Sequence, residues 1–324
     1  MAIYIDANNK IKNIFMNING EKKSISSAWV NKDGIPAKVF SAENSFVPGI
    51  VSWSDGTDEE IAQILNDHYA GIINISDYWN VGDTRTIHLS NMGSWQAGTD
   101  KKGEIHAAQD VEVVIIGFNT DDLVEPINGN TKAAITVQLK KALVNNGMID
   151  FDFEQKRMNK NSYTSNWTSC QRRTWTNTLF KESLPDSLKL LLKKVMKPSY
   201  GIYNSAVTGS WNCTYRIETY SYDYCFLLSP KEVGINEILI SHFEATNGIP
   251  KRGKDGYEYY RYISDGHIYD YYLDEKNRKK ESTWWTRFPS FINNSPCFAT
   301  VTPSGTHGGA WADNLHGIIP AFCL

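Results

Sequence analysis

The chain has few cysteines, and they form no recognisable pattern. There are five, an odd number, and they are widely spaced with no C-x-x-C pair. Such usage signals neither a disulfide framework nor a zinc site. We therefore expect buried free thiols at Cys170, Cys213, Cys225, Cys297 and Cys323.

Long apolar runs and an excess of basic charge are also missing. Nowhere do about eighteen apolar residues follow one another, so no membrane insertion is expected. The N-terminus has no basic segment followed by an apolar run, so we expect no signal peptide and synthesis in the cytoplasm. The formal net charge is −3, so the chain has no excess of basic residues of the kind that binds a nucleic acid, and no such partner is expected.

Aromatic residues, in contrast, are abundant. The 324 residues include 10 Trp, 17 Tyr and 13 Phe, and 41% of the chain is hydrophobic. A chain of this size can bury a sizeable core, and its length predicts a small domain and a large one. Aromatic side chains suit both strands and binding surfaces, because they have few rotamers to freeze.

The N-terminal part contains an internal repeat, in which Phe15 recurs as Trp29 and Gly20 as Gly34. Each unit is an apolar strand, an Asn-Gly or Asp-Gly turn and a second strand, which is a hairpin signature. Hairpins of this size are marginal alone. Residues 1–50 are therefore predicted to form an all-β assembly or attachment module, stabilised by other subunits in a homo-oligomer such as a trimer. An ordinary small sheet packed on the main domain is the alternative.

Residues 51–75 are predicted to contain a linker and a short helix. Thr57 or Asp58 can cap this helix, acidic residues fill its first turn, and Gly71 follows its end. Its apolar positions recur on one face, which predicts packing on that side.

Residues 76–324 alternate between strand and helix patterns. Residues 111–118 form a continuous apolar run, which predicts a buried strand. A helix is expected over residues 131–145, another from Asn166, and a third with Pro185 in its first turn. The solvated face of that third helix would carry Lys189, Lys193, Lys194 and Lys197.

Two later segments have different compositions. Residues 225–234 predict a buried strand that leads into a turn. Residues 251–282 predict a polar surface with a stripe of tyrosines, which is a second possible recognition surface.

The C-terminal part has two core-like ends and a polar middle. It opens with Trp284, Trp285 and Arg287 and closes with the apolar residues 317–324. Between them, residues 289–316 place Asn, Ser, Thr, His and Trp among Gly and Pro. Short polar and aromatic side chains on loops are how a rigid scaffold presents a binding surface.

Several motifs, taken in order, resemble a family of uncharacterised domains common in phages and prophages of gut bacteria. They are Trp167-Thr-Ser169, Ser183-Leu-Pro185, residues 225–233, Trp284-Trp-Thr-Arg287 and residues 317–322. This resemblance spans residues 76–324. The N-terminal repeat, in turn, resembles the short β modules at the N-termini of phage tail and baseplate proteins.

The same C-terminal pattern is similar to that of the C-type lectin-like domain. That family includes formylglycine-generating enzymes and the variable proteins of diversity-generating retroelements. The resemblance implies an α+β fold for the main domain, with framework roles for Trp284, Trp285, Arg287, Pro320 and Phe322. It also implies ligand contacts, as in the variable proteins, for Phe291, Asn293, Asn294, Thr306, His307, Trp311, Asp313, Asn314 and His316.

No metal or cofactor is expected. Calcium-dependent lectins need clustered carboxylate and amide oxygens, and the usual lectin motifs are absent. Formylglycine-type oxidation would need a reactive cysteine pair, whereas Cys297 and Cys323 lie in apolar runs typical of inert thiols. His307 has no serine or cysteine partner in a recognisable nucleophile elbow.

Asp150, Asp152 and Glu154 are the one carboxylate group that could support catalysis. They could act as the acid and base of a glycoside hydrolase. They also alternate with apolar residues, which is typical of the solvated face of an edge strand.

The leading hypothesis is a non-enzymatic receptor-binding protein of a phage tail. It would bind a bacterial cell-surface saccharide or protein, contact other tail proteins, reside in the virion and be made in the host cytoplasm. A glycan-degrading enzyme that acts on the cell surface through Asp150, Asp152 or Glu154 is the alternative.

Overall fold

The computed structural model divides the chain into two units, Met1–Ser52 and Trp53–Leu324. The described residues are 15–18, 21–24, 27–32, 35–41, 51–95, 104–143, 158, 166–205, 212–230, 232–234, 257–260, 263–264, 267–268, 275–292, 295–312, 314 and 316–324. Helices and antiparallel sheets are both present, so the predicted α+β class is confirmed.

The first unit contains the two predicted hairpins. β1 (Phe15–Ile18) pairs with β2 (Glu21–Ser24), and β3 (Ser27–Lys32) pairs with β4 (Ile35–Ser41), both antiparallel. In each hairpin the last residue of the first strand lies opposite the first residue of the second. Only the Asn-Gly or Asp-Gly pair stands between them in the sequence, and such pairs favour tight hairpin turns.

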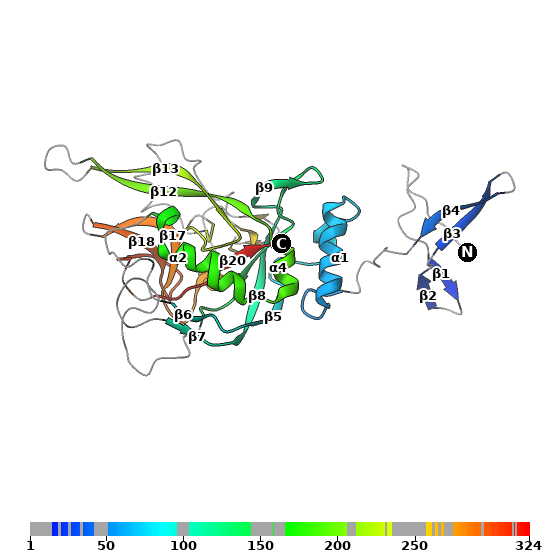
Figure 1. Cartoon of the computed structure of the whole chain (residues 1–324), viewed down its shortest axis with the longest axis horizontal. Helices are drawn as coiled ribbons and strands as arrows, with labels where there is room; N and C mark the ends of the chain where they lie inside the picture. Colours follow the sequence, from blue (N-terminus) through cyan, green and yellow to red (C-terminus); the bar gives the residue numbers. More distant parts are fainter. Residues whose placement is uncertain are drawn as a thin grey trace. The chain divides into compact units, whose positions relative to one another are not determined.

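The second unit is built on an antiparallel sheet with the strand order β14-β20-β11-β8-β5. Its strands are β5 (Thr84–Leu89), β8 (Gln109–Phe118), β11 (Ile135–Leu139), β14 (Cys225–Phe226) and β20 (Ala321–Cys323). Residues 113–117 of β8 are buried in one run, as predicted. β20 lies inside the sheet, and Figure 1 shows it in the middle of the unit. The apolar C-terminal run is therefore core, as expected.

The helix predicted over residues 131–145 is wrong. β10 (Asn130–Lys132) and β11 occupy the described part of this stretch. Ile135, Thr136 and Val137 are β-branched, which favours strands. β11 lies between β8 and β20 and is buried throughout, so its polar residues Thr136 and Gln138 are in the core as well. Ile135, Val137 and Leu139 alternate with these polar residues, which is the period of a strand and not of a helix.

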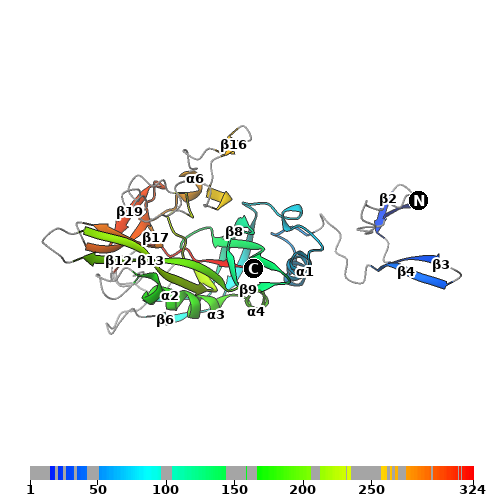
Figure 2. The same cartoon turned by 90° about the horizontal axis from the view of Figure 1, so that it is seen from above.

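A second sheet has the order β10-β9-β12-β13. It consists of β10, β9 (Asp122–Ile127), β12 (Val195–Ser205) and β13 (Asn212–Asp223). β12 and β13 form a long hairpin that is visible in both Figure 1 and Figure 2. Val195 lies opposite Leu123, so β9 joins the sheet at the start of β12.

Lys197 is buried on β12, so its predicted place on a solvated helix face is wrong. The helix after Pro185 is α4 (Asp186–Leu191), which ends before this position. Beyond it the chain becomes a strand, in which successive side chains point to opposite faces. Lys194 is accordingly exposed, whereas Lys197 is only 1% exposed.

A third sheet contains most of the C-terminal region. Its strands are β17 (Trp284–Ile292), β18 (Ser295–Val301) and β19 (His307–Ala310), in that order. Two small strand pairs are β6 (Gly93–Trp95) with β7 (Glu104–His106) and β15 (Ile263–Ser264) with β16 (His267–Ile268).

The helix α1 (Asp58–Tyr69) begins at the predicted cap. The Thr57 hydroxyl accepts a hydrogen bond from the Glu60 backbone, and the Glu60 carboxylate accepts one from the Thr57 backbone. Together these bonds form a capping box. Asp58 accepts a hydrogen bond from Ser187 of α4, and Figure 1 shows α1 and α4 side by side.

The helical stretch predicted from Asn166 is also present, in short pieces. They are η2 (Trp167–Ser169), α2 (Gln171–Trp175), the π-helical turn η3 (Thr176–Phe180) and α3 (Lys181–Ser183). The other short elements are η1 (Ile75–Asp77), η4 (Glu258–Tyr260) and α6 (Glu275–Arg278). Among the described residues, no helix is both long and apolar enough to cross a membrane.

The four described thiols are free and buried, as predicted. They belong to Cys170, Cys225, Cys297 and Cys323, while the side chain of Cys213 lies outside the described residues. Burial raises the pKa of Cys170 to about 11. These thiols are therefore part of the core, as a low-reactivity cysteine should be.

The polar surface predicted for residues 251–282 is present at the exposed residues Glu258, Lys279 and Glu281, but the predicted tyrosine stripe is wrong at Tyr257 and Tyr260. Tyr257 is 1% exposed and Tyr260 is fully buried. Tyr260 donates a hydrogen bond to Gln138, which is buried on β11. A buried tyrosine usually finds such a partner for its hydroxyl, so these two rings stabilise the core instead of forming a recognition stripe.

Candidate functional site

The C-terminal region rests on buried side chains at its two ends. Trp284, Trp285 and Phe322 are fully buried, and Arg287 is 3% exposed. Trp285 donates its backbone hydrogen bond to the carbonyl of Gly317, which ties the two ends together. The predicted burial of these residues, and of Pro320, is confirmed.

Gly317 is needed at this junction because the space around it is full. A Cβ atom at this position would lie 2.9 Å from Cβ of Ala142, which is closer than side-chain carbons approach. A side chain at this position would therefore clash with Ala142, and only glycine allows the two segments to pack this closely.

The predicted contact residues lie above this framework and are exposed to different degrees. Thr306 and Asn314 are exposed, while His307, Trp311 and His316 are half-buried. The side chain of Phe291, on β17, lies outside the described residues, as do the whole of Asn293, Asn294 and Asp313.

The strand register separates the two histidines. His307 lies opposite Val301, which lies opposite Trp284, so these residues form one row across the sheet. The ring of His316 instead packs edge-on against Trp285, with centroids 4.8 Å apart. Because neighbouring residues of a strand point to opposite faces, the two histidines belong to different faces of this sheet.

Burial also changes the charge of these histidines. It lowers the pKa of His316 to about 4, and it lowers the pKa of His307. Both rings are therefore neutral at neutral pH, where they can donate and accept hydrogen bonds.

The turn between β18 and β19 gathers three hydroxyl groups. The Thr302 hydroxyl oxygen lies 2.8 Å from that of Ser304 and 2.7 Å from that of Thr306. Gly305 has a φ of 85°, and its carbonyl accepts a 2.9 Å hydrogen bond from Nε of Arg278. The buried guanidinium of Arg278 thus holds the turn in place. The hydroxyl groups of the turn lie on the exposed side.

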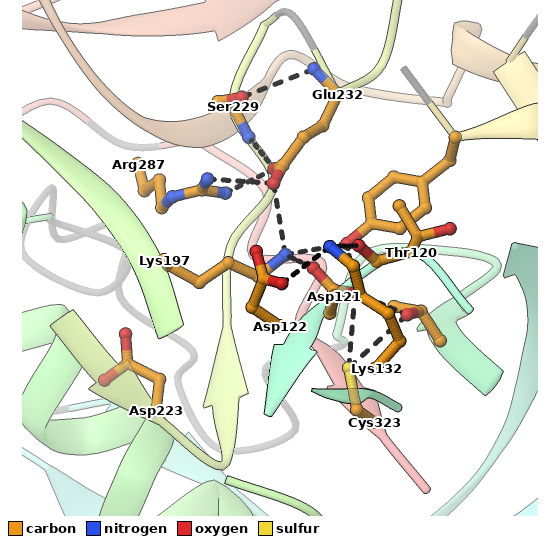
Figure 3. A network of polar contacts seen from close by, with 12 residues as sticks. Thr120, Asp121, Asp122, Lys132, Lys197, Asp223, Ser229, Glu232, Arg287 and Cys323 are labelled. Carbon is orange, nitrogen blue, oxygen red and sulfur yellow. Dashed lines mark hydrogen bonds and ion pairs between the residues drawn. The ribbon is translucent and has the colours of Figure 1, made fainter. Parts of the chain in front are cut away.

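A second cluster, which the sequence did not predict, lies in the core. Lys197 and Arg287 contact the carboxylates of Asp121 and Glu232 there (Figure 3). Their side chains are between 1% and 15% exposed. The two positive and two negative charges balance, as buried charges must.

Glu232 joins the two cations. Nζ of Lys197 lies 3.1 Å from Oε1 of Glu232, and Arg287 forms two bonds to the same carboxylate. The backbone N–H of Ser229 adds a 2.7 Å bond to Oε2. Burial alone would raise the pKa of Glu232, but Arg287 and Lys197 outweigh it and hold this pKa well below its usual range.

Asp121 is surrounded by donors. Its Oδ1 accepts from Lys197, and its Oδ2 accepts from Thr136 Oγ1 at 2.5 Å and from the Tyr257 hydroxyl at 2.7 Å. The Cys323 thiol lies 3.3 Å from Oδ2. Burial, together with the Asp121 charge, raises the pKa of Tyr257 and of Cys323 well above normal values, so both remain protonated donors.

A third group of polar side chains fixes the helical stretch to β13. Asp223 is fully buried and accepts from Arg173 Nε at 2.7 Å, from Trp167 Nε1 at 3.0 Å and from the Ser221 hydroxyl at 2.7 Å. Because its oxygens are occupied by donors from the surrounding elements, this aspartate is structural.

Part of the core cluster was predictable from local sequence patterns. Arg287 stands beside paired tryptophans in a stretch predicted to be core, and its burial is confirmed. Ser229 and Glu232 have the spacing at which a hydroxyl and a carboxylate bond each other's backbone. The pairing of Lys197 with Asp121 had no such local signal, because it depends on how β9 and β12 align.

The comparisons with known proteins give one match. A family model described as "Domain of unknown function (DUF6273)" matches residues 136–324. That span includes Lys197, Glu232 and Arg287, and it begins after Asp121. No curated protein and no solved structure matches the chain.

Proposed function

This chain belongs to the DUF6273 family of domains of unknown function, and from that premise we propose that it is a non-enzymatic receptor-binding or adhesion protein of a phage tail. In this proposal the second unit is a C-type lectin-like domain that recognises a ligand on the bacterial surface. The first unit is an assembly module that forms a homotrimer and contacts other tail proteins in the virion.

One observation supports the recognition role most directly. Polar and aromatic side chains with partial or full exposure, at positions 302–316, are mounted on a framework whose Trp284 and Trp285 are fully buried. Binding residues carried on loops above a rigid scaffold can vary without disturbing the fold. This division between rigid framework and exposed face is what ligand recognition requires.

The chemistry of the exposed face favours a polar ligand. Thr302, Ser304 and Thr306 supply neighbouring hydroxyl groups, and Asn314 supplies an exposed amide. Such groups both donate and accept, which matches the hydroxyl groups of a saccharide or the backbone of a protein. Trp311 adds a half-exposed aromatic ring of the kind that forms binding hot spots.

The carboxylates of the core cluster are bonded to other protein groups and are not arranged to bind an external glycan. Each oxygen of Glu232 accepts hydrogen bonds from the protein, and Lys197 donates to three protein oxygens. Their described partners are all protein groups, so a glycan-degrading enzyme would need other residues. The candidates for that role, Asp150, Asp152 and Glu154, lie outside the described residues.

Binding of the labelled full chain to host cells and to their purified surface polysaccharide tests the proposal. Combined Thr306→Ala and Asn314→Ala changes should weaken binding at least tenfold. Leu190→Ser, at an 85% exposed position on α4, is the matched control and should bind normally.

If the double variant and the control bind alike, the recognition face lies elsewhere. If the wild-type chain binds neither cells nor polysaccharide, the proposed function is wrong. Release of shorter saccharides from the polysaccharide would instead support the glycan-degrading alternative.

A further inference from the structure

Lys197 lies on β12 and faces Asp121, the residue that precedes the neighbouring antiparallel strand β9. Val195 on β12 lies opposite Leu123 on β9, so the same register, continued by two residues, places Lys197 opposite Asp121. Their side chains are 1% and 6% exposed, and Nζ of Lys197 contacts Oδ1 of Asp121. The fold therefore holds an amino group against a carboxyl group with almost no water.

Burial opposes the charged form of Lys197, although Asp121 and Glu232 outweigh it and raise the pKa of this group. Nζ of Lys197 lies 3.9 Å from the centre of the Phe226 ring, and Phe226 is fully buried. An isolated charge is costly in such a site, and even a paired one loses its hydration. A reaction that removes both charges would remove this cost.

We propose that Lys197 and Asp121 condense to an amide, an isopeptide bond that cross-links β12 to the residue preceding β9. The bond would join two parts of the chain that are distant in sequence. It would form within the folded protein and require no partner, metal or cofactor. This inference is independent of the proposed recognition role.

The reaction begins with a proton transfer. Nζ of Lys197 gives one proton to Oδ1 of Asp121, which produces a neutral amine and a neutral acid. The lone pair of the amine then forms a bond to Cγ, and the electrons of the carbonyl bond move onto Oδ2. Thr136 and Tyr257 already donate to Oδ2, at 2.5 and 2.7 Å, so they would stabilise the negative charge as it develops.

Glu232 completes the reaction as a catalytic residue. It lies 3.1 Å from Nζ, accepts a second proton from it and passes that proton to Oδ1. The carbonyl then re-forms, the bond from Cγ to Oδ1 breaks, and Oδ1 leaves as water. One ammonium and one carboxylate thus become one amide and one water, so atoms and charge balance without an oxidant or other co-reactant.

Arg287 keeps Glu232 in the form that this step needs. It forms two hydrogen bonds to the carboxylate, which orient this group beside Nζ of Lys197 and help to keep it ionised. Arg287 does not touch Lys197 or Asp121 in any described contact and is a positioning residue.

A neighbouring pair provides an internal comparison. Nζ of Lys132 lies 2.7 Å from Oδ1 of Asp122, and Figure 3 shows this pair close to the buried one. Its side chains are 39% and 50% exposed, so water solvates both charges. We expect this pair to remain a salt bridge.

Intact-mass spectrometry of the denatured full chain tests the proposal. Wild-type protein should be lighter than its sequence by one water, and peptide mapping should find the Asp121 and Lys197 peptides joined. Lys197→Arg should restore the full sequence mass. Lys132→Arg, the matched control, should still lack one water.

A second variant examines the catalytic step. Glu232→Gln keeps the size of the side chain but cannot accept a proton from Nζ, so it should return to the full sequence mass. If this variant is insoluble, the wild-type mass and peptide map still decide the question.

Three results would overturn the proposal. Wild-type protein could have its full sequence mass. The loss of water could persist in Lys197→Arg, as it would if a succinimide at an Asp-Gly pair such as Asp55-Gly56 caused it. Or the loss could persist in Glu232→Gln, which would remove the assigned role of that residue.

Discussion

At the scale of single residues, burial separates two kinds of side chain in the C-terminal region. Trp285 is fully buried and contacts both Phe298 and His316 through its ring. Trp311 is half-buried between Ala310 and Ala312, which both point into the core. Two tryptophans in one region therefore have different roles, one in packing and one at the surface.

Trp285→Ala should destabilise the protein severely. Removing a large aromatic side chain from a packed core costs about 3 to 5 kcal/mol, so the variant should be insoluble or melt far below the wild type. Thermal unfolding measures this, with Leu190→Ala as a control at an exposed site. An unchanged melting temperature would show that the framework is placed wrongly.

His316 should make stability depend on pH. Its folded pKa is lowered to about 4 by burial, below the ordinary value of 6.5, so the unfolded chain binds a proton between these values that the folded chain does not. Its contribution is therefore complete above pH 6.5 and declines as pH falls toward 4.

His316→Gln should accordingly lose less stability than the wild type when the pH is lowered from about 7 to about 5. The measurement is the melting temperature of both proteins at the two pH values. Equal losses would mean that the histidine is solvated in the folded protein.

At the scale of elements, local signals were reliable where the element depends on nearby residues. Thr57 with Glu60 predicted the start of α1, and the Asn-Gly and Asp-Gly pairs predicted both N-terminal hairpins. The helix expected over residues 131–145 is wrong, because Ile135, Val137 and Leu139 alternate with polar residues at the period of a strand. The prediction that Lys197 lies on a solvated helix face is wrong because α4 ends at Leu191, before this position.

The capping box of α1 should contribute measurably to stability. Thr57→Ala removes the side-chain acceptor of the Glu60 backbone N–H, and loss of such a cap costs about 1 kcal/mol. Chemical denaturation should show this loss, and Thr57→Ser should restore most of the stability. If alanine and serine behave alike, the cap is not formed in solution.

The candidate site was predictable only in part, and the reason is also structural. The framework and the loop residues of the C-terminal part follow one another in the sequence. The apolar composition of the framework could therefore be told apart from the polar composition of the loops. The core cluster joins Asp121, Lys197, Glu232 and Arg287, which are far apart in the sequence and meet only after three sheets have formed. No local pattern records such a meeting.

At the scale of the whole molecule, the two units should separate in function. A chain that begins at Trp53 should keep the melting temperature of the second unit, because α1 and the three larger sheets lie within that unit. It should lose the ability to form trimers, because hairpins that are marginal alone are expected to gain stability from other subunits.

Light scattering of the full and shortened chains at micromolar concentration tests this expectation. The full chain should be an oligomer and the shortened chain a monomer. A monomeric full chain with an ordered first unit would contradict the assembly role.

The central claim is that a rigid framework carries a separate recognition face, and Trp311 tests it most directly. Thermal melting and host-cell binding should be measured together on Trp311→Ala. Because the side chain is half-buried, we expect a stability loss of about 1 kcal/mol, well below that of a buried tryptophan. Binding should weaken by about 2 kcal/mol or more, as for a hot-spot residue. A large drop in melting temperature would place Trp311 in the core. Unchanged binding in a stable variant would contradict the claim that Trp311 belongs to the recognition face.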